Sequence, residues 1–308
     1  MSSKSVLFRD LKKLVGEQHT DGQSKQFASL RGLPFWIWNI DEHRSEYAKT
    51  DGFCCMQHVI GLPEKDGIPK PMFDYEKTLY DALMINESHN PLNHAFKHKH
   101  LWVLKSTGLG VTEFFLRVMA WLALRNDDYR NSQMVIVTGP NQDIAIKLIR
   151  RMKALFEPKL GITFDSKETA LTLNGCDIQA YPSNHTDSFR ALANPKFLLI
   201  DEGDYFRLSE QSEFRAVSER YIAKSDPYIA FVSTPNAPGQ LFESIQKEPA
   251  ETCLYKRLFL DYSYGLGKIY TADEIEKAKQ SPSFEREYNL KYLGKIGNVF
   301  HTKILKQQ

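Results

Sequence analysis

Cysteine and long apolar runs are scarce in this sequence. The chain of 308 residues has 4 cysteines (Cys54, Cys55, Cys176 and Cys253), and no two of them form a C-x-x-C pair. This spacing argues against a zinc finger or a disulfide framework, so we expect free thiols. No stretch approaches the roughly 20 apolar residues that a membrane-spanning helix needs. The start, MSSKSVLFRDLKKLV, also lacks the uninterrupted apolar core of a secretory signal. We therefore expect an intracellular protein with no membrane partner.

Net charge is equally small. The sequence has 40 Lys and Arg against 38 Asp and Glu, which leaves +2 at neutral pH. A face that binds nucleic acid would therefore have to be local rather than global. The histidine-rich segment HAFKHKH, residues 94–100, has no acidic or thiol ligand beside it. A solvated basic segment fits it better than a metal site.

The hydrophobic pattern divides the chain into three parts. Residues 1–70 carry turn-forming Gly and Pro without a sustained period, which predicts an N-terminal lead-in. Residues 71–238 begin with a helical segment and then alternate short apolar strands with helices, whereas residues 239–308 hold one further strand and two short helices. The expected strands of the middle part are 101–105, 133–138, 176–181, 196–201 and 228–233, and its expected helices include 111–125 and 141–156. Such alternation predicts an α/β fold with a mostly parallel sheet that helices cover on both faces.

The segment KSTGLGVT, residues 105–112, lies between an expected strand and an expected helix. Phosphate-binding loops occupy this position because the N–H groups and dipole of a helix N-terminus favour anions. Gly108 and Gly110 permit close backbone approach, and Thr112 stands where a hydroxyl could bind Mg²⁺. Against the pattern G-x-x-x-x-G-K-[ST], Lys105 replaces the first glycine and Val111 replaces the lysine. Taken alone the match is weak, and a turn with two glycines can be purely structural.

Acidic and hydroxyl side chains end two later strands. KFLLIDEGD places Asp201 and Glu202 after an apolar strand, and IAFVSTPN ends in Ser233 and Thr234. Ligands of open α/β sheets bind at the carboxyl ends of the strands. We therefore expect Asp201 to hold Mg²⁺, directly or through water, and Glu202 to orient and deprotonate an attacking water. The alternative for this acidic segment is a solvent-exposed turn.

In this order the motifs resemble those of helicase-like ATPases, and most of all the ATPase domain of the large terminase subunit, the viral motor that pumps double-stranded DNA into preformed capsids. That family has a deviant phosphate loop, K-[ST]-x-x-x-G-x-[ST], which KSTGLGVT fits. The resemblance covers about residues 71–300. Its other segments are FDYEK, VTGPNQDIAIKLI, YPSNHTDSFRALANPKFLLIDEGDYF, FVSTPNAPGQLFE and SPSFEREYNLKYLGKIGNVF.

The resemblance implies a RecA-like P-loop ATPase of the ASCE class, with a small C-terminal linker subdomain and with ATP and Mg²⁺ as its cofactors. Lys105 would contact the β- and γ-phosphates, and the backbone of residues 106–111 would cradle them. Glu202 would be the catalytic carboxylate, and Ser233 with Thr234 the coupling element. Magnesium would be held by Thr112 and Asp201. The implied nucleotide-binding residues are Lys105, Ser106, Thr107, Gly108, Leu109, Gly110, Val111, Thr112, Tyr75 and Glu76, the last of which replaces the family's usual Gln on the adenine side.

Two departures from the family concern arginine and the end of the chain. Thr107 stands where many terminases have a loop arginine, whereas Arg190 matches an arginine that resembles a finger reaching into the next subunit's site. A local salt bridge is the alternative for Arg190. Large terminases continue into a nuclease domain after the segment that ends here at Phe300, so we expect no nuclease activity from this chain.

The implied partners are double-stranded DNA, a portal protein and a small terminase subunit. The motor would form a homo-oligomeric ring in the cytoplasm of an infected host cell, with the isolated chain a monomer. Candidate DNA contacts on and just beyond the helix 141–156 are Lys147, Arg150, Arg151, Lys153 and Lys159, for which a solvated helix face is the alternative. Two other function classes remain. A superfamily-2 helicase needs a second α/β domain, and a non-hydrolysing nucleotide-binding scaffold has no use for Glu202.

Overall fold

The computed structural model describes residues 73–86, 94–96, 98–125, 127–157, 163–164 and 166–293, together with two short strands, Glu64–Lys65 (β1) and Ile68–Pro69 (β2). Most of the expected lead-in, Cys54, Cys55 and Lys159 lie outside the described residues. The side chains at 94–97 in the histidine-rich segment do so as well. No described helix is both long and apolar enough to cross a bilayer.

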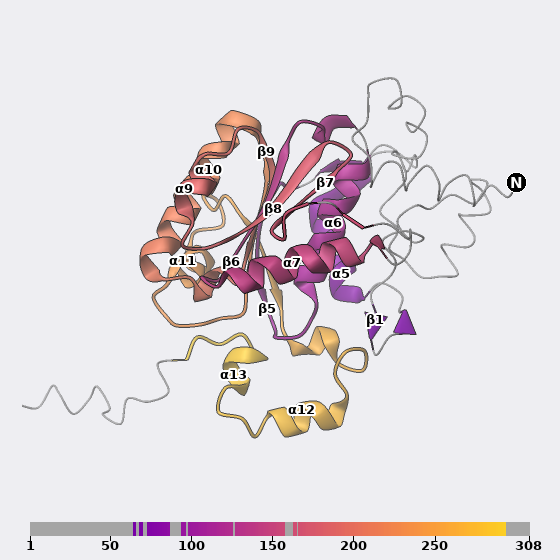
Figure 1. The fold of residues 1–308 in the computed structure, drawn as a ribbon. Helices are drawn as coiled ribbons and strands as arrows, with labels where there is room; N and C mark the ends of the chain where they lie inside the picture. Colours follow the sequence, from indigo (N-terminus) through magenta and orange to yellow (C-terminus); the bar gives the residue numbers. More distant parts are fainter. Residues whose placement is uncertain are drawn as a thin grey trace, which may run out of the picture.

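A seven-stranded sheet forms the centre of the fold (Figure 1). Its strand order is β11-β5-β10-β9-β6-β8-β7. The strands are β5 (His100–Lys105), β6 (Gln133–Thr138), β7 (Ala170–Leu173), β8 (Cys176–Pro182), β9 (Pro195–Asp201), β10 (Tyr228–Ser233) and β11 (Lys256–Leu260). Neighbouring strands pair in parallel except β7, which is antiparallel to β8. The expected mostly parallel sheet is therefore confirmed, with one antiparallel edge strand added.

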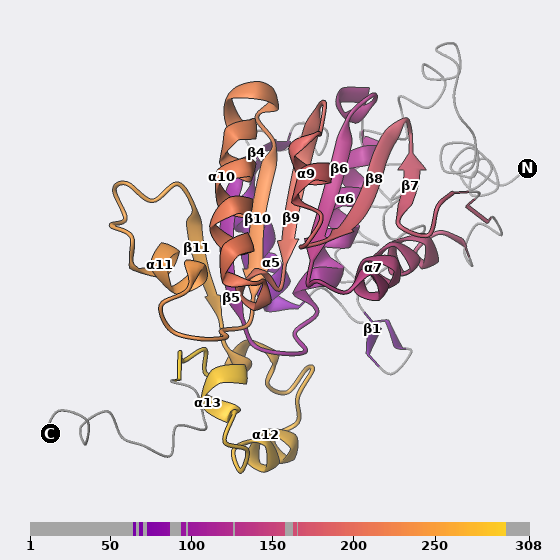
Figure 2. The same ribbon diagram turned by 60° about the vertical axis from the view of Figure 1, so that its left-hand side comes forward.

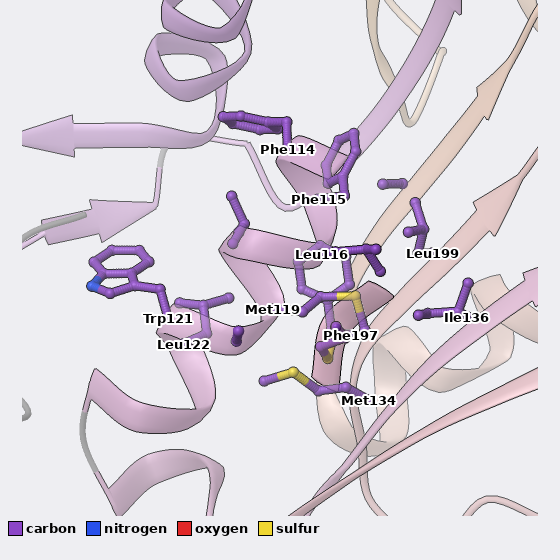
Figure 3. Packing of buried hydrophobic residues seen from close by; sticks show 14 of the residues in the cluster. Phe114, Phe115, Leu116, Met119, Trp121, Leu122, Met134, Ile136, Phe197 and Leu199 are labelled. Carbon is purple, nitrogen blue, oxygen red and sulfur yellow. The ribbon is translucent and has the colours of Figure 1, made fainter. Parts of the chain in front are cut away.

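Helices cover both faces of the sheet (Figure 2). Alternate residues of β5 show why. Leu101 and Val103 belong to one buried apolar cluster, while Trp102 and Leu104 belong to the other. The first cluster includes residues of α5 (Asp74–Leu83), α6 (Val111–Arg125) and α7 (Gln142–Ala154), and the second those of α9 (Thr186–Arg190), α10 (Leu208–Ser225) and α11 (Leu241–Lys247). Figure 3 shows side chains of α6 packed against those of β6 and β9, including the contact of Phe115 with Phe197.

A C-terminal segment, residues 262–293, lies beyond the carboxyl edge of the sheet (Figures 1 and 2). It contains a 3-10 turn (η5, Tyr262–Gly265), α12 (Ala272–Ala278) and α13 (Phe284–Glu287). The sequence pattern predicts a helix over 283–292, but α13 is much shorter. Its last carbonyl, that of Glu287, accepts a hydrogen bond from Thr107 N instead of a later residue of the same helix, and Leu290 has a left-handed φ of 59°. Contact with the rest of the protein therefore takes the place of the last expected turns.

Candidate functional site

Residues 106–110 join β5 to α6 as a tight loop at the carboxyl edge of the sheet. Gly108 and Gly110 have φ values of 74° and 79°, a conformation that other residues avoid. Leu109, between them, is buried, and its carbonyl accepts a hydrogen bond from the Tyr75 hydroxyl. Tyr75 of α5 therefore supports the conformation of the loop through this hydrogen bond. The backbone N–H groups of residues 108–110 form no hydrogen bond within the described part of the chain.

Lys105 connects the ends of three strands. Its ammonium donates to Glu202 Oε1 at 2.5 Å and to Thr234 Oγ1 at 3.1 Å. The other oxygen of Glu202 accepts the backbone N–H of Thr234 at 3.1 Å and lies 3.3 Å from Ser233 Oγ. The strand order β5-β10-β9 explains this meeting, because parallel neighbours bring their carboxyl ends to one edge. The lysine, the carboxylate and the two hydroxyls expected from distant motifs therefore lie together.

Thr112 and Asp201 form a second pair beside this cluster. Thr112 Oγ1 donates to Asp201 Oδ1 at 2.8 Å, and Asp201 is buried. Burial, reinforced by the negative charge of Glu202, raises the pKa of Asp201 to about 6, while Lys105 and the Thr112 hydrogen bond oppose the rise. Hydroxyl and carboxylate oxygens suit Mg²⁺. Among the described residues, however, no group of three or more His, Cys, Asp or Glu could hold a metal. A magnesium ion at this pair would need phosphate and water oxygens as further ligands, as is usual in nucleotide sites.

The backbone at Glu202 is strained. This residue has φ 54° and ψ 39°, a left-handed conformation that costs non-glycine residues about 1–2 kcal/mol. The following Gly203 is packed so closely that an added Cβ would lie 2.9 Å from side-chain atoms of Ile200 and Phe242. Tight packing therefore fixes the turn that directs Glu202 toward Lys105, and such strain is typical of functional sites.

Asp204, the second aspartate of DEGD, was not singled out from the sequence. It is buried and joins the ends of β9 and β10: its N–H donates to Ser233 Oγ at 3.2 Å, and its Oδ2 accepts from Asn236 N at 2.7 Å. Burial raises the pKa of Asp204 to about 7, against the opposing effect of backbone N–H donors. The DEGD motif contains this acid. Only the fold shows that Asp204 is buried and that its hydrogen bonds support the end of β10, next to Ser233 and Thr234.

The C-terminal segment and strand β11, the neighbour of β5, contact the loop directly. Ser106 N donates to Leu260 O at 2.7 Å and Thr107 N to Glu287 O at 2.9 Å. The Tyr270 hydroxyl donates to Thr107 O and lies 3.4 Å from Ser106 Oγ. The N–H groups of Ser106 and Thr107 are thus already hydrogen-bonded, which narrows the expected phosphate cradle to the backbone that follows them. Sequence reasoning missed these contacts because Leu260, Tyr270 and Glu287 lie more than 150 positions further along the chain.

Tyr75 and Glu76, expected near the adenine, are both core residues in the structure. Glu76 is only 1% exposed, and its two oxygens accept hydrogen bonds from Arg117 of α6 and from Phe73 N. Tyr75 is also 1% exposed and donates to the loop. An adenine-side role for these residues stays a prediction, because the contacts seen here are those of a brace between α5, α6 and the phosphate loop.

Arg190 and the basic helix α7 have partners on the same chain. Arg190 pairs with Glu213 at 2.7 Å, which is the local salt bridge considered from the sequence, and its action in trans stays a prediction. On α7, Lys147 is exposed, while the ion pairs and hydrogen bonds are Arg150 with Glu168, Arg151 with Glu113 and Lys153 with the carbonyl of Lys167. Arg151 also lowers the pKa of Asp201, so it lies near the magnesium pair. The expected DNA-contacting set is therefore not one uniform cationic face.

Comparisons with known proteins show similarity in fold alone. No family model and no curated protein matches the chain. The solved structures that share its architecture include three large terminases or their domains. The large terminase ATPase domain of Thermus phage P74-26 is 14% identical, with 65% of this chain and 91% of that one covered and a TM-score of 0.50. The HK97 bacteriophage large terminase is 18% identical (76% and 54% covered, TM-score 0.53). The large terminase of a thermophilic bacteriophage is 12% identical (67% and 52% covered, TM-score 0.50). The chain spans about half the length of the latter two. It has the RecA-like fold of large terminase ATPase domains.

Proposed function

We propose that this chain is the ATP-hydrolysing motor domain of a viral large terminase, which translocates double-stranded DNA into a procapsid. One observation carries the proposal: Lys105 meets Glu202 and Thr234 beside the Thr112–Asp201 pair, on a fold shared with terminase ATPase domains. Lysine for phosphate, oxygen ligands for magnesium and a carboxylate for water are the parts that phosphoryl transfer needs.

Lys105 and Glu202 would exchange partners during the reaction. The two side chains form an ion pair, and the triphosphate of ATP, which carries more negative charge than one carboxylate, competes for the ammonium. Glu202 is then free to orient the attacking water and to accept its proton, while Lys105 stabilises the β- and γ-phosphate oxygens. Thr112 and Asp201 would hold Mg²⁺, which neutralises phosphate charge when it is bound.

Coupling would start from the same strand ends. Ser233 and Thr234 contact Glu202, and Asp204 ties Ser233 to the turn after β9. Relief of charge on hydrolysis would alter these contacts and those of the loop. Because Thr107 and Tyr270 join the loop to the C-terminal segment, that segment would move in response.

Partners belong to the proposal as well. Double-stranded DNA, a portal protein, a small terminase subunit and further copies in a ring follow from the likeness to packaging motors. Arg190 could act on a neighbouring copy only after leaving Glu213, an exchange that is feasible because the arginine side chain is 47% exposed. Of the basic residues on α7, Lys147, Arg150 and Arg151 are exposed. Lys147 and Arg150 are the better DNA candidates, because the charge of Arg151 acts on Asp201.

Magnesium-dependent ATP hydrolysis, measured with and without double-stranded DNA, tests the proposal. We expect Lys105→Ala to weaken ATP binding and Glu202→Ala to abolish turnover while ATP still binds. Lys279→Ala removes an exposed lysine that pairs with Glu276 on α12 and serves as the control for loss of charge. Turnover that rises steeply with protein concentration, and is flattened by Arg190→Ala, would support the arginine in trans. Absence of nucleotide binding would refute the motor, and equal affinity of wild type and Lys105→Ala would refute the role of this lysine.

A further inference from the structure

Arg286, on the short helix α13, precedes a residue whose backbone contacts the phosphate loop. Thr107 N donates to Glu287 O at 2.9 Å, and Tyr262 N donates to Tyr288 O at 3.1 Å. The Phe284 and Tyr288 rings stack at 5.1 Å, which fixes this turn on both sides of Arg286. The backbone of Arg286 therefore lies one residue from a direct contact with the loop that would hold the phosphates.

Tyr205 lies between the surroundings of Arg286 and those of Glu202 in its electrostatic interactions. This tyrosine follows Glu202 by three residues, and its hydroxyl donates to Pro235 O, immediately after Thr234, at 3.3 Å. Burial raises the pKa of Tyr205 to about 12; the charges of Glu287 and Glu202 add to the rise, and that of Arg286 opposes it. One hydroxyl is therefore within electrostatic range of both Arg286 and Glu202. Figures 1 and 2 show α13 beyond the strand ends that carry the site.

The present partner of Arg286 is easily replaced. Both its Nη2, at 2.9 Å, and its Nε, at 3.1 Å, bind one oxygen of the adjacent Glu287, and the two side chains are 30% and 23% exposed. Partly exposed ion pairs of this kind contribute little. The planar guanidinium matches phosphate oxygens with two parallel N–H donors, and the phosphate carries more charge than one carboxylate.

Arg151 is another described arginine whose charge acts on the site, but it acts on the magnesium pair rather than on Glu202. It pairs with Glu113 and acts on Asp201, the carboxylate that would hold magnesium. A second cation there would repel the metal. The charge of Arg286 instead acts on Tyr205, whose hydroxyl donates to Pro235 O beside Thr234. The γ-phosphate and the attacking water would meet at Glu202 and Thr234.

We propose that Arg286 is a catalytic residue that leaves Glu287 and binds the γ-phosphate in the site of its own chain. The inference rests on the proposed ATPase function. In the reaction the water oxygen bonds to the γ-phosphorus, the bond from that phosphorus to the β–γ bridging oxygen breaks, and a water proton passes to Glu202. Negative charge is spread over the γ-phosphoryl and leaving oxygens, and the guanidinium stabilises it there. An arginine from the C-terminal segment thus supplies the charge that Thr107 cannot provide in the loop.

The test compares Arg286→Ala, Arg286→Lys, Glu287→Gln and the control Lys291→Ala, which removes a nearby lysine paired with Glu285. Steady-state ATP hydrolysis gives kcat and KM. Fluorescent ADP, titrated with and without magnesium and aluminium fluoride, gives binding of a ground-state ligand and of a transition-state mimic. We expect Arg286→Ala to lower kcat by about 10²–10³, the effect of removing one transition-state donor, with KM within a few-fold. Binding of the aluminium fluoride complex should weaken by a similar factor, and that of ADP alone should not.

The other variants separate catalysis from support of the fold. Arg286→Lys should recover part of the lost rate, because lysine keeps the charge but not the paired donors. Glu287→Gln should keep or raise kcat, and Lys291→Ala should match wild type. The effect of Arg286→Ala should not vary with protein concentration, unlike that of an arginine acting in trans.

Three outcomes would count against Arg286. A kcat for Arg286→Ala within threefold of wild type would overturn the inference. So would equal losses in Arg286→Ala and Glu287→Gln together with weakened ADP binding, since that pattern indicates a structural role. Turnover that depends on Lys105 and Glu202 but not on Arg286 would sink this inference alone, whereas a wild type that binds no ADP would overturn the proposed function with it.

Discussion

Replacing Glu76 by glutamine would restore the residue usual in the resembled family, yet we expect it to damage the protein. In the structure this carboxylate is 1% exposed and pairs with Arg117, itself 6% exposed, between α5 and α6. Glutamine keeps a similar shape but removes the negative charge. Arg117 would then be a buried cation without a counter-ion, and its Nε already has no hydrogen-bond partner among the described residues.

The size of the effect follows from that burial. Removing one member of a buried ion pair typically costs about 3–5 kcal/mol, because the other charge stays desolvated. For a domain of this size, each kcal/mol shifts Tm by about 2–4 °C, so Glu76→Gln should melt about 6–20 °C below wild type. Urea unfolding and thermal scans followed by circular dichroism measure both quantities. Affinity for ADP, titrated at 10 °C where the variant stays folded, should be within a few-fold of wild type.

A double variant supplies the control for this prediction. Glu76→Leu combined with Arg117→Met removes both charges and should recover most of the lost stability, as apolar replacements of buried ion pairs often do. If Glu76→Gln is as stable as wild type, the ion pair is not the brace inferred here. If the variant instead changes the preference between ATP and GTP without loss of stability, Glu76 reads the base after all.

Three further predictions concern the loop and the acidic turn. Lys105→Ala should weaken ATP binding at least tenfold in titration calorimetry. Val111→Ala should keep the affinity and lose about 1.5 kcal/mol of stability, because it removes two buried carbon groups. Equal affinities for both variants and wild type would contradict the phosphate-binding role of Lys105. Gly203→Ala places a methyl group 2.9 Å from buried side-chain atoms, so we expect about 1–3 kcal/mol of destabilisation in urea and slower ATP hydrolysis; an unchanged midpoint would show that the turn can relax. Burial raises the pKa of Asp204 to about 7 from an ordinary value of 3.8, so the folded protein keeps a proton that the unfolded chain releases. Stability should therefore fall by up to about 4 kcal/mol as pH rises from about 4 to 7, and Asp204→Asn should flatten this slope in urea unfolding; the same slope in both proteins would exclude Asp204 as its source.

Much of the fold was predictable because its signals are local. The five apolar runs of the middle part became β5, β6, β8, β9 and β10 with nearly the expected bounds. The unpredicted strand β7 also had a local signal. Asn174 and Gly175 follow it with φ values of 50° and 74°, the two-residue turn that joins antiparallel strands. Reading that Asn-Gly pair as a hairpin would have placed β7 next to β8.

The fate of individual charged side chains was less predictable. Glu76 and Asp204 lie in polar sequence contexts, yet the fold buries both of them. Arg151 follows Arg150 directly, but one pairs with Glu113 near the magnesium pair and the other with Glu168. Successive helix residues project about 100° apart, so neighbours in sequence meet different surroundings.

By itself the sequence determined the strand and helix alternation, the glycine loop and the acids and hydroxyls at the strand ends. These features depend on hydrophobic periodicity and backbone conformation, which short segments specify. Only the tertiary structure decided that Lys105 reaches across β10 to Glu202, that Glu76 faces Arg117, and that the turn bearing Arg286 contacts Thr107. Such contacts join residues 41 to 180 positions apart, and their partners follow from strand order and packing rather than from any local pattern.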